Sequence, residues 1–148
     1  MIRVQREDFD VGAELEGLAA GDHRIGGIAS FVGLVRDAGG LAALTLEHYP
    51  GMTEKKLAEI EREAQRRWPL AASLIIHRYG RLEPGDRIVL VATASPHREA
   101  ALAACHFLID WLKTEAPFWK SEETPAGERW VEARTEDDAA KQRWKLPP

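Results

Sequence analysis

Residues 87–117, RIVLVATASPHREAALAACHFLIDWLKTEAP, place a β-branched strand directly before an amphipathic helix. The apolar stripe of this helix consists of Ala101, Cys105, Leu108 and Leu112. Ser95 as N-cap and Pro96 at the first helical position predict where the helix begins. Pro117 cannot continue a helix, so the helix is expected to stop before it. The stripe also predicts that Cys105, the single cysteine, is a buried core residue.

Strand patterns lie on both sides of this segment. Runs of β-branched and alternating apolar residues predict strands at residues 25–36, 41–48 and 73–79, and a hairpin of residues 118–122 and 129–134. Turns are expected at residues 37–40, 84–86 and 125–127. Because hairpin-length turns outnumber long crossovers, the order of elements predicts a mixed, mostly antiparallel α+β sheet with flanking helices.

A second helix is predicted between the strands. Thr53 looks like its N-cap, and Met52 is placed to pack against Leu57 at the fourth helical position. Pro69 disfavours helical geometry at the residue before it, so this helix should end at Trp68. The charged residues 136–145 predict a last helix.

The composition is that of one globular domain spanning residues 1–148. The net charge of −4 disfavours a general nucleic-acid-binding protein, which needs a broad basic face. No apolar run approaches the roughly 18 residues of a membrane span, and the first residues lack the apolar stretch of a signal peptide. We therefore expect a cytoplasmic protein that binds neither nucleic acid nor a membrane.

A candidate anion site lies at the start of the helix that follows Pro96. His97 and Arg98 stand in its expected first turn, where free backbone N–H groups and the helix dipole attract anions. A phosphate group fits such a site. The alternative is that both side chains are simply solvated residues of a first turn.

Lys113 and Lys120 bracket the break at Pro117, which favours a cleft that both side chains share. A lysine in a partly dry pocket has a lowered pKa and can move protons. Two other interpretations remain open: Lys113 complements the negative end of the helix dipole, and Lys120 lies on a polar strand face with Glu122. His48, His77 and His106 lack the repeated spacing of metal ligands, so core or surface positions are expected for them. No metal and no cofactor is predicted.

Several longer stretches, taken together, closely resemble the large subunits of the molybdopterin synthase family. The matching runs are residues 44–55 (LTLEHYPGMTEK), 67–70 (RWPL), 77–78 with 84–86, 95–98, 112–114 with 116–120 (APFWK), and 129–134 (RWVEAR). They cover nearly the whole chain, and their order and spacing are far more specific than any one motif.

The resemblance implies an α/β-hammerhead fold and a sulfur transfer between two partners. Members of the family form a central homodimer, and a small ubiquitin-like sulfur carrier docks at each end to give a heterotetramer. The C-terminal Gly-Gly thiocarboxylate of the carrier enters a pocket of the large subunit. The substrate implied is cyclic pyranopterin monophosphate, and two sulfur transfers give the dithiolene of molybdopterin.

The resemblance also implies roles for individual residues. Lys113 and Lys120 match the catalytic lysines: Lys113 would be the general acid and base, and Lys120 would hold the thiocarboxylate or stabilise the oxyanion of thioester hydrolysis. Substrate-binding positions are Phe31, Leu34, Val35, Arg36, His97, Arg98, Lys113, Lys120, Ser121, Glu122 and Arg134.

Two of these positions depart from the family pattern. Leu34 stands where the family commonly has a lysine, and Ser121 stands where a basic residue is common. Side-chain contacts are therefore not expected at Leu34 and Ser121, whereas backbone contacts at these two residues and at Val35 and Glu122 are compatible with the changes. Neither change affects the two lysines. The main alternative is a non-catalytic module that binds the tail of a ubiquitin-like carrier, and the second is a module for phosphate ligands or nucleic acid.

Overall fold

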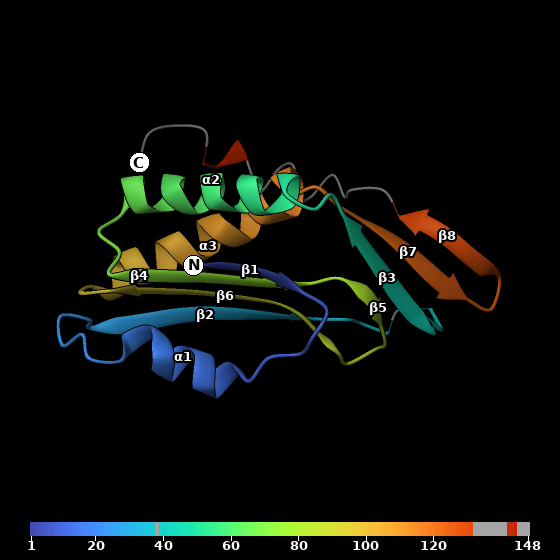
Figure 1. The fold of residues 1–148 in the computed structure, drawn as a ribbon, viewed down its shortest axis with the longest axis horizontal. Coiled ribbons are helices and arrows are strands. Elements are labelled where there is room, and N and C mark those ends of the chain that lie inside the picture. The colour runs from blue at the N-terminus through green and yellow to red at the C-terminus, as the bar shows by residue number, and fades with distance from the viewer. Residues whose placement is uncertain (38, 132–141, 145–148) are drawn as a thin grey trace.

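The computed structural model describes residues 1–37, 39–131 and 142–144, and within them two four-stranded sheets meet at an angle (Figure 1). The elements in chain order are β1 (Ile2–Gln5), α1 (Val11–Ala19), β2 (Gly27–Leu34), β3 (Ala43–His48), α2 (Met52–Arg67), β4 (Ala72–Arg78), β5 (Gly80–Leu82), β6 (Arg87–Ser95), α3 (Arg98–Glu115), β7 (Phe118–Thr124) and β8 (Gly127–Val131).

The first sheet has the order β1-β4-β6-β2, and the second has the order β5-β3-β7-β8. Only the β1–β4 pair is parallel, and every other pair is antiparallel. The prediction of a mixed, mostly antiparallel α+β fold is therefore confirmed. β2 and β3 follow each other in the chain but lie in different sheets, so the turn between them joins two layers.

The three helices of the described chain cover the two faces of the first sheet (Figure 1). On one face, α2 and α3 pack on alternate residues of the central strands, such as Ile75 and Val91. On the other face, α1 packs on the residues between them, such as Leu74 and Leu90. This two-sided burial explains why β4 and β6 read as continuous apolar runs.

The stripe predicted for α3 is confirmed, because all four of its members are buried. Cys105 is 5% exposed. Burial raises the pKa of its thiol to about 11, so the group stays protonated at neutral pH. The predicted ends of α2 and α3 are also confirmed, with C-caps at Trp68 and Ala116.

The start predicted for α2 is wrong. The N-cap is Gly51, whose φ of 84° suits glycine, and its backbone N–H donates to the carboxylate of Glu54. Thr53 lies inside the helix, and its hydroxyl donates to the carbonyl oxygen of Tyr49 at 2.8 Å. Met52 is 60% exposed and therefore does not pack against Leu57.

The start predicted for α3 is wrong by two residues, because Ser95 ends β6 rather than capping the helix. Its backbone pairs with Gly27, and its hydroxyl donates to the carbonyl oxygen of Pro69 at 2.9 Å. The N-cap is His97. The hairpin of β7 and β8 is confirmed as far as residue 131, whereas the end predicted at 134 and most of the helix predicted at 136–145 lie outside the described residues.

Three elements were not predicted: β1, α1 and β5. Of these, only α1 has a local signal, because Asp10 is its N-cap and accepts a hydrogen bond from the backbone N–H of Ala13 at 3.1 Å. No helix in the described part of the chain is long and apolar enough to cross a membrane.

Candidate active site

A cavity of about 650 Å³ lies where the two sheets meet the end of α3. Its walls come from β2, from β4 and β6, from the last turn of α3, and from β3, β7 and β8. The walls are mostly apolar, with side chains such as Phe31, Leu46, Ile88 and Phe118. A ligand that fills such a space displaces water from the apolar walls, and this strengthens the interaction between opposite charges there.

Lys113 and Lys120 both line this cavity. Lys113 lies in the last turn of α3, and Lys120 is the third residue of β7, where it pairs with Leu46 on one side and Val131 on the other. The break at Pro117 lets the chain turn from the helix into the strand between them. The two ammonium groups therefore belong to one space, although they come from different elements.

His77 is the third polar side chain of functional interest on the cavity wall, and it is only 5% exposed. Its Nδ1 lies 2.8 Å from the carbonyl oxygen of Arg78, so Nδ1 carries the proton and donates. Its ring stacks on that of Phe118, with centroids 3.7 Å apart and planes inclined by 16°.

The environment keeps His77 neutral. Burial lowers the pKa of the imidazole to about 4, and the positive charges near it, including Lys113 and Lys120, act in the same direction, against a smaller opposite effect of the hydrogen bond to Arg78. A neutral ring with the proton on Nδ1 leaves Nε2 as a hydrogen-bond acceptor.

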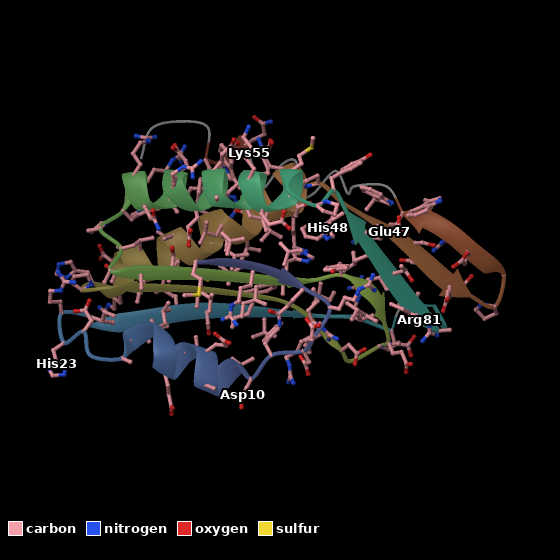
Figure 2. The ribbon with its side chains drawn as sticks, viewed as in Figure 1. Asp10, His23, Glu47, His48, Lys55 and Arg81 are labelled. Carbon is pink, nitrogen blue, oxygen red and sulfur yellow. The ribbon has the colours of Figure 1, made fainter. Side chains whose placement is uncertain are left out.

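His48 lies next to this group, at the end of β3 near the first turn of α2 (Figure 2). Its ring contacts Tyr79 and Phe118, with centroid separations of 4.5 Å and 5.8 Å. Its Nδ1 lies 3.0 Å from the hydroxyl oxygen of Thr53, whose own proton goes to Tyr49. Nδ1 of His48 is therefore a donor too.

The other predicted site residues divide into those at the cavity and those away from it. Phe31 and Leu34 line it. Val35 is buried beside it, and its N–H and C=O are already bonded to Asp86 and Gly85 at 2.9 Å and 2.8 Å. Arg36 follows as an exposed residue that does not line the cavity.

Ser121 and Glu122 follow Lys120 in β7 but do not line the cavity. Ser121 is buried, and the carboxylate of Glu122 accepts a hydrogen bond from Arg129 at 3.1 Å. Both residues lie between β3 and β8 in the sheet, so their backbone groups take part in strand pairing.

His97 and Arg98 lie at the opposite end of α3 from Lys113, and both are exposed. A helix rises about 1.5 Å per residue, so Arg98 and Lys113 are separated by about 22 Å along α3. Within one chain, the first turn of α3 and the lysine pair are therefore not part of one pocket. Arg134 lies outside the described residues.

Sequence reasoning expected a core or surface position for His77, which lies in an apolar strand. It is buried, but it also faces the cavity, and periodicity alone could not separate the two possibilities. The only sequence signal was a polar residue at an inward position of a strand that is otherwise apolar. Among the residues that the structure describes, no group of three or more His, Cys, Asp or Glu side chains is placed to hold a metal ion.

Comparison with known proteins identifies the family. The family model described as MoaE protein matches residues 4–115. The molybdopterin synthase catalytic subunit of Ralstonia nicotianae is 57% identical over 148 residues, covering 98% of this chain and 84% of that relative. A solved structure, the molybdopterin biosynthesis MoaE protein from Burkholderia ambifaria, is 57% identical with a TM-score of 0.87, covering 99% of this chain and 98% of that one. The chain therefore belongs to the MoaE family.

A more distant solved structure has the same fold. It is a protein–protein complex of subunits 1 and 2 of molybdopterin-converting factor from Helicobacter pylori, with 19% identity and a TM-score of 0.77 over 90% of this chain and 91% of that one. At this low identity, the similarity shows a shared fold and nothing more.

Proposed function

We propose that this protein is a cytoplasmic, single-domain catalytic subunit of molybdopterin synthase. It transfers sulfur from the C-terminal thiocarboxylate of a small ubiquitin-like carrier to cyclic pyranopterin monophosphate, and the product carries the dithiolene of molybdopterin. The observation that supports this proposal most directly is the convergence of Lys113 and Lys120 on one apolar cavity. Membership of the MoaE family gives independent support.

The lysine pair has two tasks in this reaction. In each transfer the carrier sulfur attacks a side-chain carbon of the pterin and a carbon–oxygen bond breaks at that carbon, so that the cyclic phosphate opens to a monoester in one transfer and water leaves in the other. Water then cleaves the bond between the acyl carbon and the sulfur, which leaves the sulfur on the pterin and releases the carrier as a carboxylate. Lys113 gives and takes the protons of these steps. Lys120 holds the thiocarboxylate and stabilises the oxyanion that forms during hydrolysis. Both lysines are exposed in the free chain, and a bound carrier tail would displace water from the apolar walls and thereby strengthen both effects.

The carrier enters this scheme as a second subunit. The H. pylori structure with this fold is a complex of two subunits. In the present chain, a cavity of about 650 Å³ with apolar walls has room for the narrow end of an extended peptide tail. Two terminal glycines have no side chains, so they suit a channel bounded by Phe31 and Phe118.

The site is completed by a second copy of the chain. No described strand pairs with the outer edge of β2, and its Ile28 and Leu34 side chains are 39% and 55% exposed. An open edge with apolar side chains favours pairing with another strand. β2 also connects the predicted anion site with the cavity: its first residue, Gly27, lies beside Arg98, and its last, Leu34, lines the cavity.

Antiparallel pairing of two β2 strands would therefore place the first turn of the partner's α3 beside the cavity of this chain. In that arrangement His97 and Arg98 of the partner subunit bind the phosphate of the substrate, at the N-terminus of a helix. Arg36, two residues beyond β2, adds positive charge near this site, and Arg134, which lies outside the described residues, remains a proposed substrate-binding residue. The homodimer thereby accounts for the separation of about 22 Å between Arg98 and Lys113 within one chain.

The alternative is a non-catalytic receptor for the carrier tail, and one experiment separates the two. Purified protein is incubated with a thiocarboxylated carrier and cyclic pyranopterin monophosphate, and dithiolene product is measured. Wild type should form product. Lys55→Ala is a control that should also form product, because Lys55 lies on the exposed side of α2 (Figure 2). Lys113→Ala and Lys120→Ala should not. Tail binding by the wild type without any product would support the receptor instead.

A further inference from the structure

His77 has a feature that the proposed chemistry does not use. Among the described residues that line the cavity, His77 is the only one whose side chain can accept a hydrogen bond. The other side chains are apolar, or they donate only, as the two lysines and the indole of Trp119 do. A ligand group that needs an acceptor inside the cavity has this one side chain to bind.

The geometry determines which atom of His77 is available. Nδ1 is engaged with the carbonyl oxygen of Arg78 at 2.8 Å, and one ring face is covered by Phe118 at 3.7 Å between centroids. The polar atom that remains is Nε2, on the distal edge of the ring. Because the nearby lysines and the burial both disfavour a charged imidazole, Nε2 keeps its lone pair.

The cavity therefore combines two kinds of recognition. The lysines attract an anion, and Nε2 of His77 accepts a proton donor close to that anion. The last residue of a peptide has this arrangement, because a single Cα joins its amide N–H to its anionic end. An inserted peptide would otherwise leave that N–H unpaired in an apolar channel, which is costly.

We infer that His77 is a binding residue for the carrier tail: its Nε2 accepts the amide N–H of the terminal glycine, whose anionic end lies against Lys113 and Lys120. This inference rests on the proposed function, because it requires the tail to enter this cavity. The neutral imidazole suits the task better than a carboxylate would. A carboxylate would also accept the N–H, but it would cancel the positive charge that the anion needs.

A thermodynamic cycle on the ligand and the protein tests this contact. The probes are a synthetic eleven-residue peptide ending in Gly-Gly and the same peptide ending in Gly-sarcosine, whose N-methyl group removes the amide proton. Each is titrated into full-length wild type, His77→Phe and His77→Gln, and binding is followed by NMR and calorimetry. Phenylalanine keeps the ring stack and removes the acceptor, whereas glutamine keeps an uncharged acceptor.

We expect N-methylation to weaken binding to wild type by about tenfold, the usual cost of leaving one buried hydrogen bond unmade. The same change should weaken binding to His77→Phe much less, and His77→Gln should recover part of the difference. The added bulk of the methyl group affects all three proteins and cancels in the comparison. Equal losses in wild type and His77→Phe would overturn the inference.

Two controls separate this inference from the proposed function. Lys113→Ala and Lys120→Ala should each weaken the Gly-Gly peptide, and a peptide with a C-terminal amide should bind poorly to wild type. If both hold and the cycle shows no coupling, the His77 contact fails while tail binding stands. If wild type shows no saturable binding of the Gly-Gly peptide, both proposals fail together.

Discussion

His77 and Phe118 stack with ring centroids 3.7 Å apart, and this contact joins β4 of the first sheet to β7 of the second. It forms part of the wall of the cavity that both lysines line. The contact therefore links the packing of the two layers to the geometry of the site. A substitution at His77 is therefore expected to affect both the stability of the fold and the binding of a ligand.

The first prediction concerns pH and stability. The pKa of His77 is about 4 in the folded protein, below the ordinary value near 6.5 in the unfolded chain. Below about pH 6.5 the imidazole of His77 is protonated in the unfolded state, whereas in the folded state it stays neutral down to about pH 4. The contribution of His77 to stability is therefore lost as the pH falls towards 4. This contribution should change by at most about 1.4 kcal/mol per pH unit.

The measurement is urea unfolding of wild type and His77→Gln between pH 7 and pH 4.5. The free energy of unfolding should fall more steeply for wild type than for the variant. Parallel curves for the two proteins would mean that His77 does not titrate abnormally.

The second prediction concerns Cys105. The thiol is buried in the core under α3, and the transferred sulfur comes from the carrier, so Cys105→Ala should retain sulfur transfer at a near-normal rate. Stability should fall by about 1 kcal/mol, because a small cavity replaces the sulfur atom. Native protein should also react slowly with iodoacetamide at pH 7.5. A folded Cys105→Ala variant without activity would contradict the scheme.

The third prediction tests whether two chains share each site. Arg98→Ala and Lys113→Ala should each be inactive alone. After unfolding and refolding as an equal mixture, about a quarter of the sites combine an intact Lys113 with the partner's intact Arg98, because half of the dimers are mixed and one of their two sites is whole. Activity should return to about that level. A mixture that stays inactive, although the mixed dimer is present, would place both residues in the same chain.

The fourth prediction concerns the edge of β2. Ser30 is exposed near the middle of this strand, so Ser30→Lys should bring two like charges together at the axis of the proposed dimer. Sedimentation should show a monomer, and turnover should be lost. Leu102→Lys is a matched control, since Leu102 is 63% exposed on α3 outside the β2 edge. A Ser30→Lys variant that remains dimeric would exclude pairing at this edge.

Local patterns in the sequence predicted the elements that local forces determine. The stripe of α3 and its end before Pro117 are examples, because periodicity and the missing N–H of proline act within a few residues. The start of α3 was misplaced because Ser95 is held by distant partners, Gly27 in β2 and the carbonyl oxygen of Pro69. Ser95 is a good N-cap residue by type, but in the fold it ends β6 and its hydroxyl donates to Pro69.

The site was predictable in part for the same reason. Lys113 and Lys120 flank one turn of chain, so their convergence could be expected from sequence. The position of His77 opposite Phe118 depends on how two sheets meet, which no local pattern encodes. The distance of His97 and Arg98 from the lysines was not predicted either. The predicted helix between Arg98 and Lys113 nevertheless implied that its two ends lie far apart.

Single-turnover formation of the dithiolene by Lys113→Ala tests the central claim most directly. Loss of a general acid or base costs about a hundredfold to ten-thousandfold in rate, whereas loss of a cation at a helix C-terminus costs only about 0.3 to 1 kcal/mol of stability. At a concentration of thiocarboxylated carrier that saturates the variant, Lys113→Ala should still bind the carrier but form almost no product. Lys113→Arg should also be slow, because arginine keeps the charge but does not release its proton at neutral pH. Wild-type rates in both variants would contradict the account and leave Lys113 with only a structural role.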